Sequence, residues 1–151
     1  MIRRVNNRAR APIPQKSAKP VERHYPAQDP SVFAGPAVWM HLHSTAAAYD
    51  GSTTQKNAFI KLVQSIQDNF PCERCRRNLV KHLKELPLGQ YLGNRDELFL
   101  WTYLMHDKVN KLKQGISSTD PQICSPPLDE IKKYYFESLN LDCSNCSSPQ
   151  N

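Results

Sequence analysis

A repeat of apolar residues between positions 59 and 70 constrains the fold of this chain more than any other feature. Its members are Phe59, Leu62, Val63, Ile66 and Phe70. Their spacing places all of them on one face of an α-helix, and such a face has to be buried against another element. The remaining sequence has no alternating strand pattern, no βαβ unit and no internal repeat. The sequence therefore predicts an all-α protein.

Four further helices are predicted from their start and stop signals. Proline is favourable in a first helical turn, so Pro36 is expected to begin one helix, while Asn94 and Glu97 form the capping box of another. Gly115 is the natural end of that second helix. The predicted helices cover residues 35–50, 52–70, 72–86, 94–114 and 126–139. Together they predict a four-helix bundle with a short fifth helix.

The net charge of +6 is confined to an N-terminal arm. Residues 1–23 carry seven Arg or Lys and one acidic residue, so the rest of the chain is neutral. The arm is rich in proline and poor in large apolar residues, which predicts a disordered segment over residues 1–30. We expect it to keep the protein soluble rather than to bind nucleic acid. One domain is then predicted over residues 31–140, followed by a flexible tail over residues 141–151.

Targeting and membrane-spanning segments are not expected. No apolar run approaches the roughly 18–20 residues that span a bilayer, and no apolar stretch follows the first basic residues as in a secretory signal peptide. The arm resembles a mitochondrial presequence in composition, but its prolines interrupt a continuous helix. We therefore predict a protein that acts in the compartment where it is made and has no membrane partner.

Four of the five cysteines form two CxxC pairs. Cys72 and Cys75 follow a proline at the start of a predicted helix, where unpaired N–H groups and the helix dipole stabilise a thiolate. The two-residue gap lets both sulfurs meet within one turn as an easily opened disulfide. This placement predicts a redox-active dithiol, with an inert buried pair as the alternative. Cys124 is left unassigned.

Two other kinds of site compete for this pair. A thioredoxin-like site requires strands around the motif, and none is predicted. A zinc site would join Cys72 and Cys75 to Cys143 and Cys146, since four thiolates bind zinc as a tetrahedron. The 67 residues between the two pairs exceed the usual spacing of such a site, so we expect no metal.

A dithiol that oxidises other thiols needs an electron acceptor nearby, and two pairs of side chains indicate a cofactor. Trp39 and His43 stand four positions apart in one predicted helix, as do His106 and Asn110 in another, so each pair shares a helical face. A flat aromatic ring with imidazole and amide groups suits a planar cofactor that forms hydrogen bonds. The alternative is core positions for Trp39 and His43 and a solvent-exposed face for the other two.

Several short motifs also occur in a fixed order along the chain. They are Gly35, Trp39, Leu42 and His43, then Ala46 to Tyr49, then Phe70, Pro71, Cys72 and Cys75, and finally Trp101, His106, Val109 and Asn110. In order and spacing this arrangement resembles the Erv/ALR family of sulfhydryl oxidases over about residues 33–115. It resembles above all the compact members encoded by large nucleocytoplasmic DNA viruses.

The resemblance implies a four-helix bundle, usually a homodimer, that holds FAD between helices against the active disulfide. It implies that Cys72 exchanges electrons with thiol-containing client proteins, that Cys75 lies next to the flavin, and that O2 is the final acceptor, giving H2O2. The residues implied to bind FAD are Gly35, Trp39, His43, Tyr49, His106, Asp107, Val109, Asn110, Lys111 and Lys113, the two lysines at its phosphates. We therefore predict an FAD-linked thiol oxidase, with a non-enzymatic zinc-binding or adaptor module as the alternative.

Three positions depart from the family pattern. Asp107 stands where many members have Asn, which adds a negative charge near the expected adenine end of the site. Tyr103 occupies the place of a cysteine that, in cellular members, crosslinks the fourth helix to the chain downstream, so we expect no such disulfide and leave Cys124 without this partner. Asp50 replaces a proline, which is expected to change only the end of the first helix.

The second pair, Cys143 and Cys146, lies in the predicted flexible tail. Family members often carry a shuttle dithiol on such a segment, and the resemblance implies this role here. The alternatives are a pair without function and a bridge between chains. The viral likeness further implies action in the host cytoplasm or in the virion, in surroundings that keep host thiols reduced. The mitochondrial intermembrane space is the alternative location.

Overall fold

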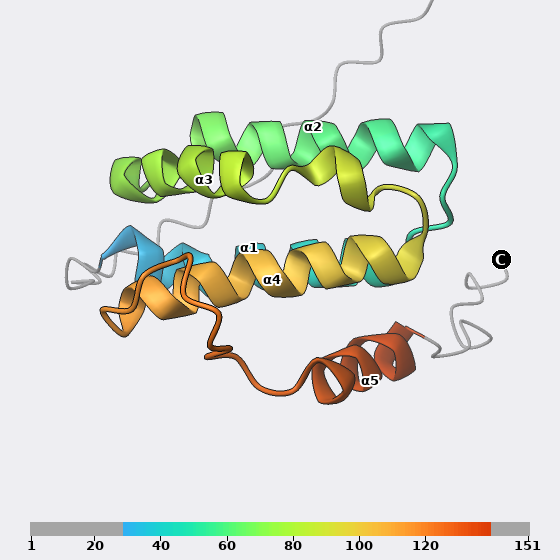
Figure 1. The fold of residues 1–151 in the computed structure, drawn as a ribbon. Helices are drawn as coiled ribbons and strands as arrows, with labels where there is room; N and C mark the ends of the chain where they lie inside the picture. Colours follow the sequence, from blue (N-terminus) through green and yellow to red (C-terminus); the bar gives the residue numbers. More distant parts are fainter. Residues whose placement is uncertain (1–28, 140–151) are drawn as a thin grey trace, which may run out of the picture.

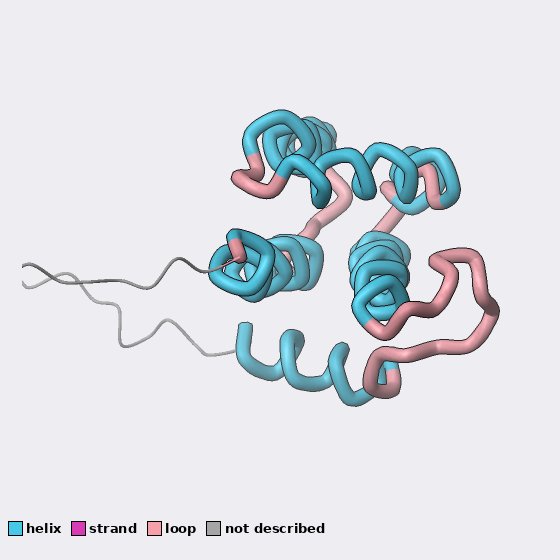
Figure 2. Tube along the Cα trace, turned by 90° about the vertical axis from the view of Figure 1, so that its left-hand side faces the viewer, coloured by secondary structure: helices cyan, strands magenta, loops and turns pink. Residues whose placement is uncertain are grey.

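The computed structural model describes residues 29–139, which fold into five α-helices and one short 3-10 helix. The elements are α1 (Pro30–Ala47), α2 (Thr53–Asn69), α3 (Glu73–Glu85), η1 (Leu88–Tyr91), α4 (Arg95–Lys113) and α5 (Leu128–Leu139). Loops join the helices, and this part of the chain contains no strand (Figure 2). The predicted all-α fold is confirmed.

The helices lie in layers that enclose a common interior. α2 and α3 pack side by side as one layer, α1 and α4 form the layer beside it, and α5 lies across the outer side of α1 and α4 (Figure 1). α1 and α3 begin at the same end of the bundle, where α4 finishes (Figure 1). This arrangement brings the CxxC pair, the start of α1 and the end of α4 together.

The first helix begins earlier than the sequence indicates, so the predicted start at Pro36 is wrong. α1 starts at Pro30 because Asp29 acts as its N-cap, its carboxylate accepting a hydrogen bond from the Ser31 N–H at 2.8 Å. Pro30 stands at the first helical position, where its missing N–H costs nothing, and Pro36 lies inside the helix. The helix also ends at Ala47, before the predicted residue 50. The prediction was wrong because Pro30, the actual first residue of the helix, was assigned to the disordered arm.

The predicted starts of α2 and α4 are confirmed by their caps, and α5 begins two residues later than predicted. Ser52 caps α2, its hydroxyl accepting from the Gln55 N–H at 3.2 Å, and the Asn94 side chain accepts from the Glu97 N–H at 3.0 Å to begin α4. Gly115 follows α4 with φ +73°, a left-handed conformation that glycine adopts without strain. These local signals were therefore sufficient to divide most of the chain into helices.

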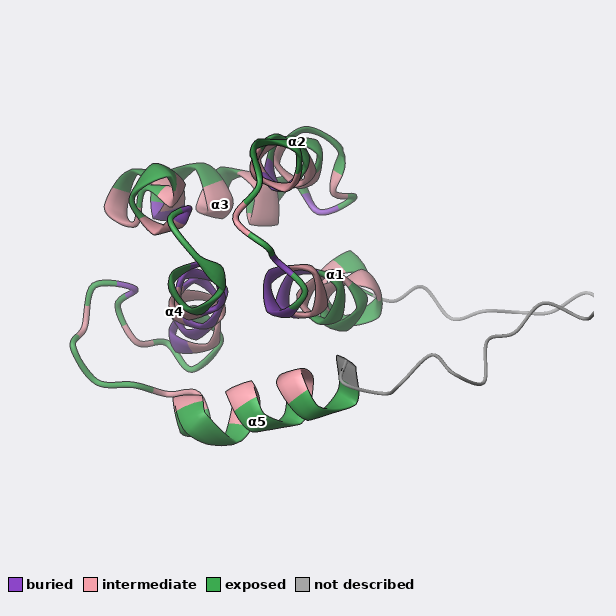
Figure 3. Ribbon diagram, turned by 90° about the vertical axis from the view of Figure 1, so that its right-hand side faces the viewer, coloured by how far each residue is buried: buried purple, intermediate pink, exposed green. Residues whose placement is uncertain are grey.

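The core lies between the two layers and centres on α4. Buried side chains face this interior, while the outer faces of the helices are exposed (Figure 3). Phe59 of α2 meets Trp101 of α4 edge to face, with ring centroids 6.0 Å apart, and the Trp101 indole N–H donates to the Leu86 carbonyl at 3.1 Å. The most buried large apolar side chains are Phe59, Leu98, Phe99, Trp101 and Met105. No helix among residues 29–139 is both long and apolar enough to cross a bilayer.

Candidate active site

The site is built around the disulfide between Cys72 and Cys75 at the start of α3. Cys72 is the N-cap of the helix, and its sulfur accepts a hydrogen bond from the Cys75 N–H at 3.2 Å. The Arg76 guanidinium donates to the Phe70 carbonyl, which holds the turn before the motif. The predicted location of the pair at a helix N-terminus is confirmed. There the helix dipole stabilises negative charge on sulfur once the disulfide opens.

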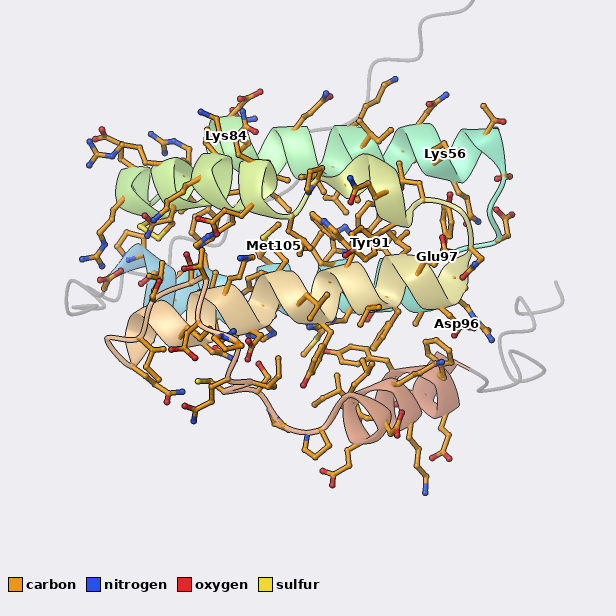
Figure 4. The ribbon with its side chains drawn as sticks, in the orientation of Figure 1. Lys56, Lys84, Tyr91, Asp96, Glu97 and Met105 are labelled. Carbon is orange, nitrogen blue, oxygen red and sulfur yellow. A yellow bond between two sulfur atoms is a disulfide. The ribbon has the colours of Figure 1, made fainter. Side chains whose placement is uncertain are left out.

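A cavity of about 730 Å³, including the part open to solvent, runs from this disulfide into the bundle. All four helices of the two layers contribute to its walls, and most of the lining is apolar. Met105 lies between α4 and the layer of α2 and α3 (Figure 4). The lining residues are Ser31, Gly35, Val38, Trp39, Leu42, Val63, Ile66, Phe70, Cys75, Arg76, Leu79, His82, Trp101, Met105, Val109 and Lys113. Cys75 is thus on the wall of the cavity, and Cys72 is not.

The polar groups of this cavity are few and concentrated. Arg76 in the first turn of α3 and Lys113 in the last turn of α4 provide two cations at the end of the bundle where α3 begins and α4 finishes. Deeper along α3, the buried His82 adds an imidazole. An apolar slot with cations at one end suits a large planar group that carries an anionic tail.

Three rings from α1 and α4 form a second cluster beside the cavity. Trp39 and His106 are stacked, with centroids 4.2 Å apart and planes within 4°. The Thr102 hydroxyl donates to the Phe99 carbonyl at 2.7 Å, so it accepts from His43 Nδ1 at 2.8 Å. That leaves His43 Nε2 to accept from His106 Nδ1 at 3.1 Å. The hydrogen bonds therefore assign neutral Nδ1–H forms to both histidines and leave His106 Nε2 as an acceptor.

The electrostatics of this cluster favour the same neutral forms. Burial lowers the pKa of His43 to about 4, and the neighbouring His106 lowers it in the same direction. Burial likewise lowers the pKa of His106 to about 4, with a further lowering by Lys113 that Asp107 opposes. Both rings are therefore uncharged at neutral pH.

Asp107 ties α4 to the loop that follows it. One carboxylate oxygen accepts from the backbone N–H groups of Cys124 and Ser125, at 2.7 and 2.8 Å, and the other lies 2.9 Å from Lys111 Nζ. Burial alone would raise the pKa of Asp107, but the lysine and the two backbone donors outweigh it and hold that pKa below its usual value. Lys111 Nζ also donates to the Asp120 carbonyl at 2.7 Å. Both side chains are buried and fully engaged within the protein.

The structure thus divides the predicted cofactor residues into three groups. Gly35, Trp39, Val109 and Lys113 line the cavity with Cys75, and His43 and His106 stand directly behind Trp39. The others bind the chain itself. Tyr49 donates to the Leu92 carbonyl at 2.9 Å, Asn110 donates to the Ser125 hydroxyl at 3.0 Å, and Asp107 and Lys111 hold the loop.

These geometric features agree with the comparison to known families. The model of the Erv1/Alr family matches residues 36–125, which is more than half of the chain. The chain belongs to the Erv1/Alr family. The matched segment contains the CxxC pair and the whole of α2, α3 and α4.

Two curated relatives are similar to this Erv1/Alr chain. The mitochondrial FAD-linked sulfhydryl oxidase of Saccharomyces cerevisiae is 32% identical over 79 residues, which are 51% of this chain and 41% of that protein. A probable FAD-linked sulfhydryl oxidase of Acanthamoeba polyphaga mimivirus is 31% identical over 75 residues, or 48% of this chain and 52% of that protein. The chain spans about half the length of the curated relatives it matches. No solved structure matches the chain.

Tyr103 occupies the position where cellular Erv1/Alr members have a crosslinking cysteine, and in this chain its side chain forms a hydrogen bond instead. Tyr103 donates its phenol to the Pro126 carbonyl at 2.9 Å, joining α4 to the start of α5. Cys124 is a free, half-buried thiol in the same loop. The loop is therefore held to α4 by polar contacts of Tyr103 and Asp107.

Sequence reasoning missed several residues on the cavity wall, above all His82. Cys75, Leu79 and His82 follow the i, i+4, i+7 spacing of one helical face, so the face of Cys75 predicts that His82 accompanies it. On α4 a spacing of four links Trp101, Met105, Val109 and Lys113, of which Val109 and Lys113 were already among the predicted cofactor residues. Extending each helical face from its functional residue would have added Met105 and His82.

The predicted shuttle pair, Cys143 and Cys146, lies outside the described residues. Its role stays a prediction. Among residues 29–139 no group of three or more His, Cys, Asp or Glu side chains is placed to hold a metal ion.

Proposed function

We propose that this chain is an FAD-dependent thiol oxidase that forms disulfide bonds in client proteins. The observation that carries the proposal is the placement of Cys75 on the wall of a cavity enclosed by four helices, in a disulfide at a helix N-terminus. Membership of the Erv1/Alr family and two relatives named as FAD-linked sulfhydryl oxidases support it.

The residues of the cavity fit FAD. The apolar walls suit the flavin ring, and Arg76 and Lys113 provide charge for the phosphates. His82 has two buried ring nitrogens without a hydrogen-bond partner in the protein. The Trp39 and His106 stack, with the free acceptor at His106 Nε2, gives the cofactor an aromatic and polar neighbour. When bound, FAD accepts two electrons from the reduced cysteine pair and transfers them to O2, giving H2O2.

The cysteines carry out thiol–disulfide exchange. A client thiolate attacks Cys72, the sulfur that is off the cavity wall, and forms a mixed disulfide while Cys75 leaves as a thiolate. A second client thiolate then displaces Cys72, so the client gains a disulfide and the enzyme holds two reduced sulfurs. The α3 N-terminus stabilises the thiolates, and Arg76 adds positive charge beside Cys75. Overall, two client thiols and O2 become one disulfide and H2O2.

We propose a structural role for Asp107 and Lys111 in place of the cofactor contacts that the resemblance implies. All four of their polar contacts are within the protein, to the loop over residues 120–125 and to each other. Lys113, which lies at the cavity, is the better partner for an FAD phosphate.

The proposed assembly is a homodimer. Phe33 and Met40 stand two turns apart on α1, and their side chains are 77% and 60% exposed. Apolar side chains exposed on one helical face are typical of a surface that meets a partner. The clients are proposed to be dithiol-containing proteins.

The proposed location follows from the two relatives. One is named as mitochondrial and the other is from a virus. We propose the cytoplasm of an infected cell or the virion, with the mitochondrial intermembrane space as the second possibility.

Oxygen uptake with dithiothreitol tests the proposal. The purified chain, supplied with FAD, is expected to be yellow and to consume O2, and Cys75→Ser is expected to reduce uptake to background while the protein stays yellow. Cys124→Ser, which removes the free half-buried thiol, is the matched control and should retain uptake. A wild-type protein that remains colourless with excess FAD and consumes no O2 contradicts the proposed function.

A further inference from the structure

His82 is buried without a hydrogen-bond partner. Its side chain is 1% exposed, and Nδ1 and Nε2 are the only buried side-chain nitrogen or oxygen atoms among residues 29–139 that lack a partner. Glu85 Oε2 lies 3.6 Å from Nδ1, beyond hydrogen-bonding distance. A buried polar group without a partner costs stability, so its retention calls for a reason outside the protein's own contacts.

The Glu85 carboxylate is occupied elsewhere. Its Oε2 lies 2.9 Å from Lys108 Nζ and accepts from the Ser118 hydroxyl at 3.2 Å, so its hydrogen bonds go to those two groups. Burial lowers the pKa of His82, and Glu85 offsets only part of this effect. The ring is therefore neutral and carries one proton, which the nearby carboxylate favours at Nδ1. Nε2 is left as an acceptor.

The position of His82 points to the occupant of the cavity. His82 lines the cavity that Cys75 also lines, and the two residues share one face of α3. Cys75 and His82 are seven positions apart, which is about 10 Å along the helix. An extended ring system that touches Cys75 can bridge that length, while a single small ring cannot. Of the cations on the cavity wall, Lys113 is exposed and Arg76 is half-buried, whereas His82 is buried, so His82 meets the part of the occupant that enters deepest.

We propose that His82 is a cofactor-binding residue, whose imidazole accepts a hydrogen bond from an N–H or O–H group of FAD at the inner end of the four-helix cavity. This inference rests on the proposed function. The flavin ring has an imide N–H and the ribityl chain has hydroxyls, so FAD carries donors of this class. Binding of FAD then gives His82 the partner that the protein does not provide.

A cofactor role and a purely structural role of His82 differ in the FAD-free protein. Replacement by leucine removes an unpaired buried polar group, so His82→Leu should unfold at the same temperature as the wild type or a higher one when FAD is absent. The same variant should bind FAD about tenfold more weakly, because the cofactor loses one hydrogen bond in a buried site. A structural role predicts instead a lower unfolding temperature of the FAD-free chain.

The experiment titrates the FAD-free chain of 151 residues with FAD and follows the quenching of flavin fluorescence, together with thermal unfolding. His82→Gln, whose amide oxygen also accepts a hydrogen bond, should recover most of the affinity that His82→Leu loses. His41→Leu is the matched control, because His41 is exposed on α1 and does not line the cavity, and it should leave the affinity unchanged.

Three results would overturn the role of His82. They are wild-type affinity in His82→Leu, a lower unfolding temperature of FAD-free His82→Leu, and no recovery of affinity in His82→Gln. A failure of the proposed function looks different, because the wild-type chain would then bind no FAD at all.

Discussion

His43 of α1 and His106 of α4 share one hydrogen bond, with Nε2 and Nδ1 3.1 Å apart. One ring has to donate this bond and the other has to accept it. Because the Thr102 hydroxyl accepts from His43 Nδ1, His43 Nε2 is the acceptor and His106 Nδ1 is the donor. A proton added at His43 Nε2 would face the proton of His106 Nδ1. α1 and α4 form the most extensive helix–helix contact among the described residues, and this contact therefore depends on neutral histidines.

Acidification should destabilise the FAD-free protein through these rings. Their folded pKa values are about 4, against 6.5 for an ordinary histidine, so between pH 6.5 and 4 the unfolded chain binds more protons and stability falls as the pH falls. The loss should be on the order of 3 kcal/mol for each ring between pH 7 and 4. Urea unfolding at several pH values measures it. Replacing both rings with Gln should flatten the dependence, and His41→Gln should not; an equally steep profile in the double variant contradicts the prediction.

Trp39→Ala should weaken FAD binding. The indole lines the cavity and stacks on His106, so its removal takes away a flat wall and frees the imidazole. A loss of about tenfold in affinity is expected from the aromatic contact. Titration of the FAD-free chain measures it, with Trp39→Phe as the control that keeps an aromatic face. Equal affinity of Trp39→Ala and the wild type would remove Trp39 from the site.

Asp107→Asn should be strongly destabilising. The change leaves the buried Lys111 ammonium without its carboxylate and weakens the acceptor of two backbone N–H groups. Breaking such a buried pair costs about 3–5 kcal/mol. Asp96→Asn is the matched control, because Asp96 forms an ion pair with Lys132 at an exposed site, where about 0–1 kcal/mol is expected. Chemical denaturation compares the two, and similar losses would contradict the anchoring role of Asp107.

Tyr103→Phe should lower the free energy of unfolding by about 1 kcal/mol, because it removes only the hydrogen bond to the Pro126 carbonyl. Tyr134→Phe serves as the control, since Tyr134 is 65% exposed and its hydroxyl has access to water. Denaturant unfolding curves of the two variants, compared by their midpoints at an equal dependence of the free energy on denaturant, give the difference in the free energy of unfolding. If both variants match the wild type, the phenol does not hold the loop.

The shuttle prediction is tested by replacing Cys143 and Cys146 together with Ser. Oxidation of a reduced protein substrate should slow severalfold while oxidation of dithiothreitol is unchanged, because a small dithiol needs no shuttle to react with the Cys72–Cys75 disulfide, even though Cys72 is only 8% exposed. Parallel oxygen-uptake assays on the two substrates make the comparison, with Cys124→Ser as the control for the loss of a thiol. An unchanged rate on the protein substrate rejects the shuttle.

Local patterns in the sequence were enough for the fold class, most helix boundaries and the placement of the CxxC pair at a helix start. The apolar repeat of α2, the caps Ser52 and Asn94, and the position of Cys72 at a helix start act over a few residues, so they can be read along the chain. The predicted start of α1 was wrong because Pro30 and Pro36 are both possible first-turn residues. Only the capping contact of Asp29 with Ser31 decides between them.

Only the tertiary structure decided what each polar side chain of the site contacts. The spacing along α3 places His82 on the same face as Cys75, but it does not show that His82 lacks a hydrogen-bond partner. Nor does the spacing along α4 show that Asp107 is enclosed by backbone donors from a loop. Those outcomes depend on how α3, α4 and the loop after α4 pack together. Hydrogen-bond partners far apart in sequence are set by that packing, whereas helix formation is set largely by neighbours within one turn.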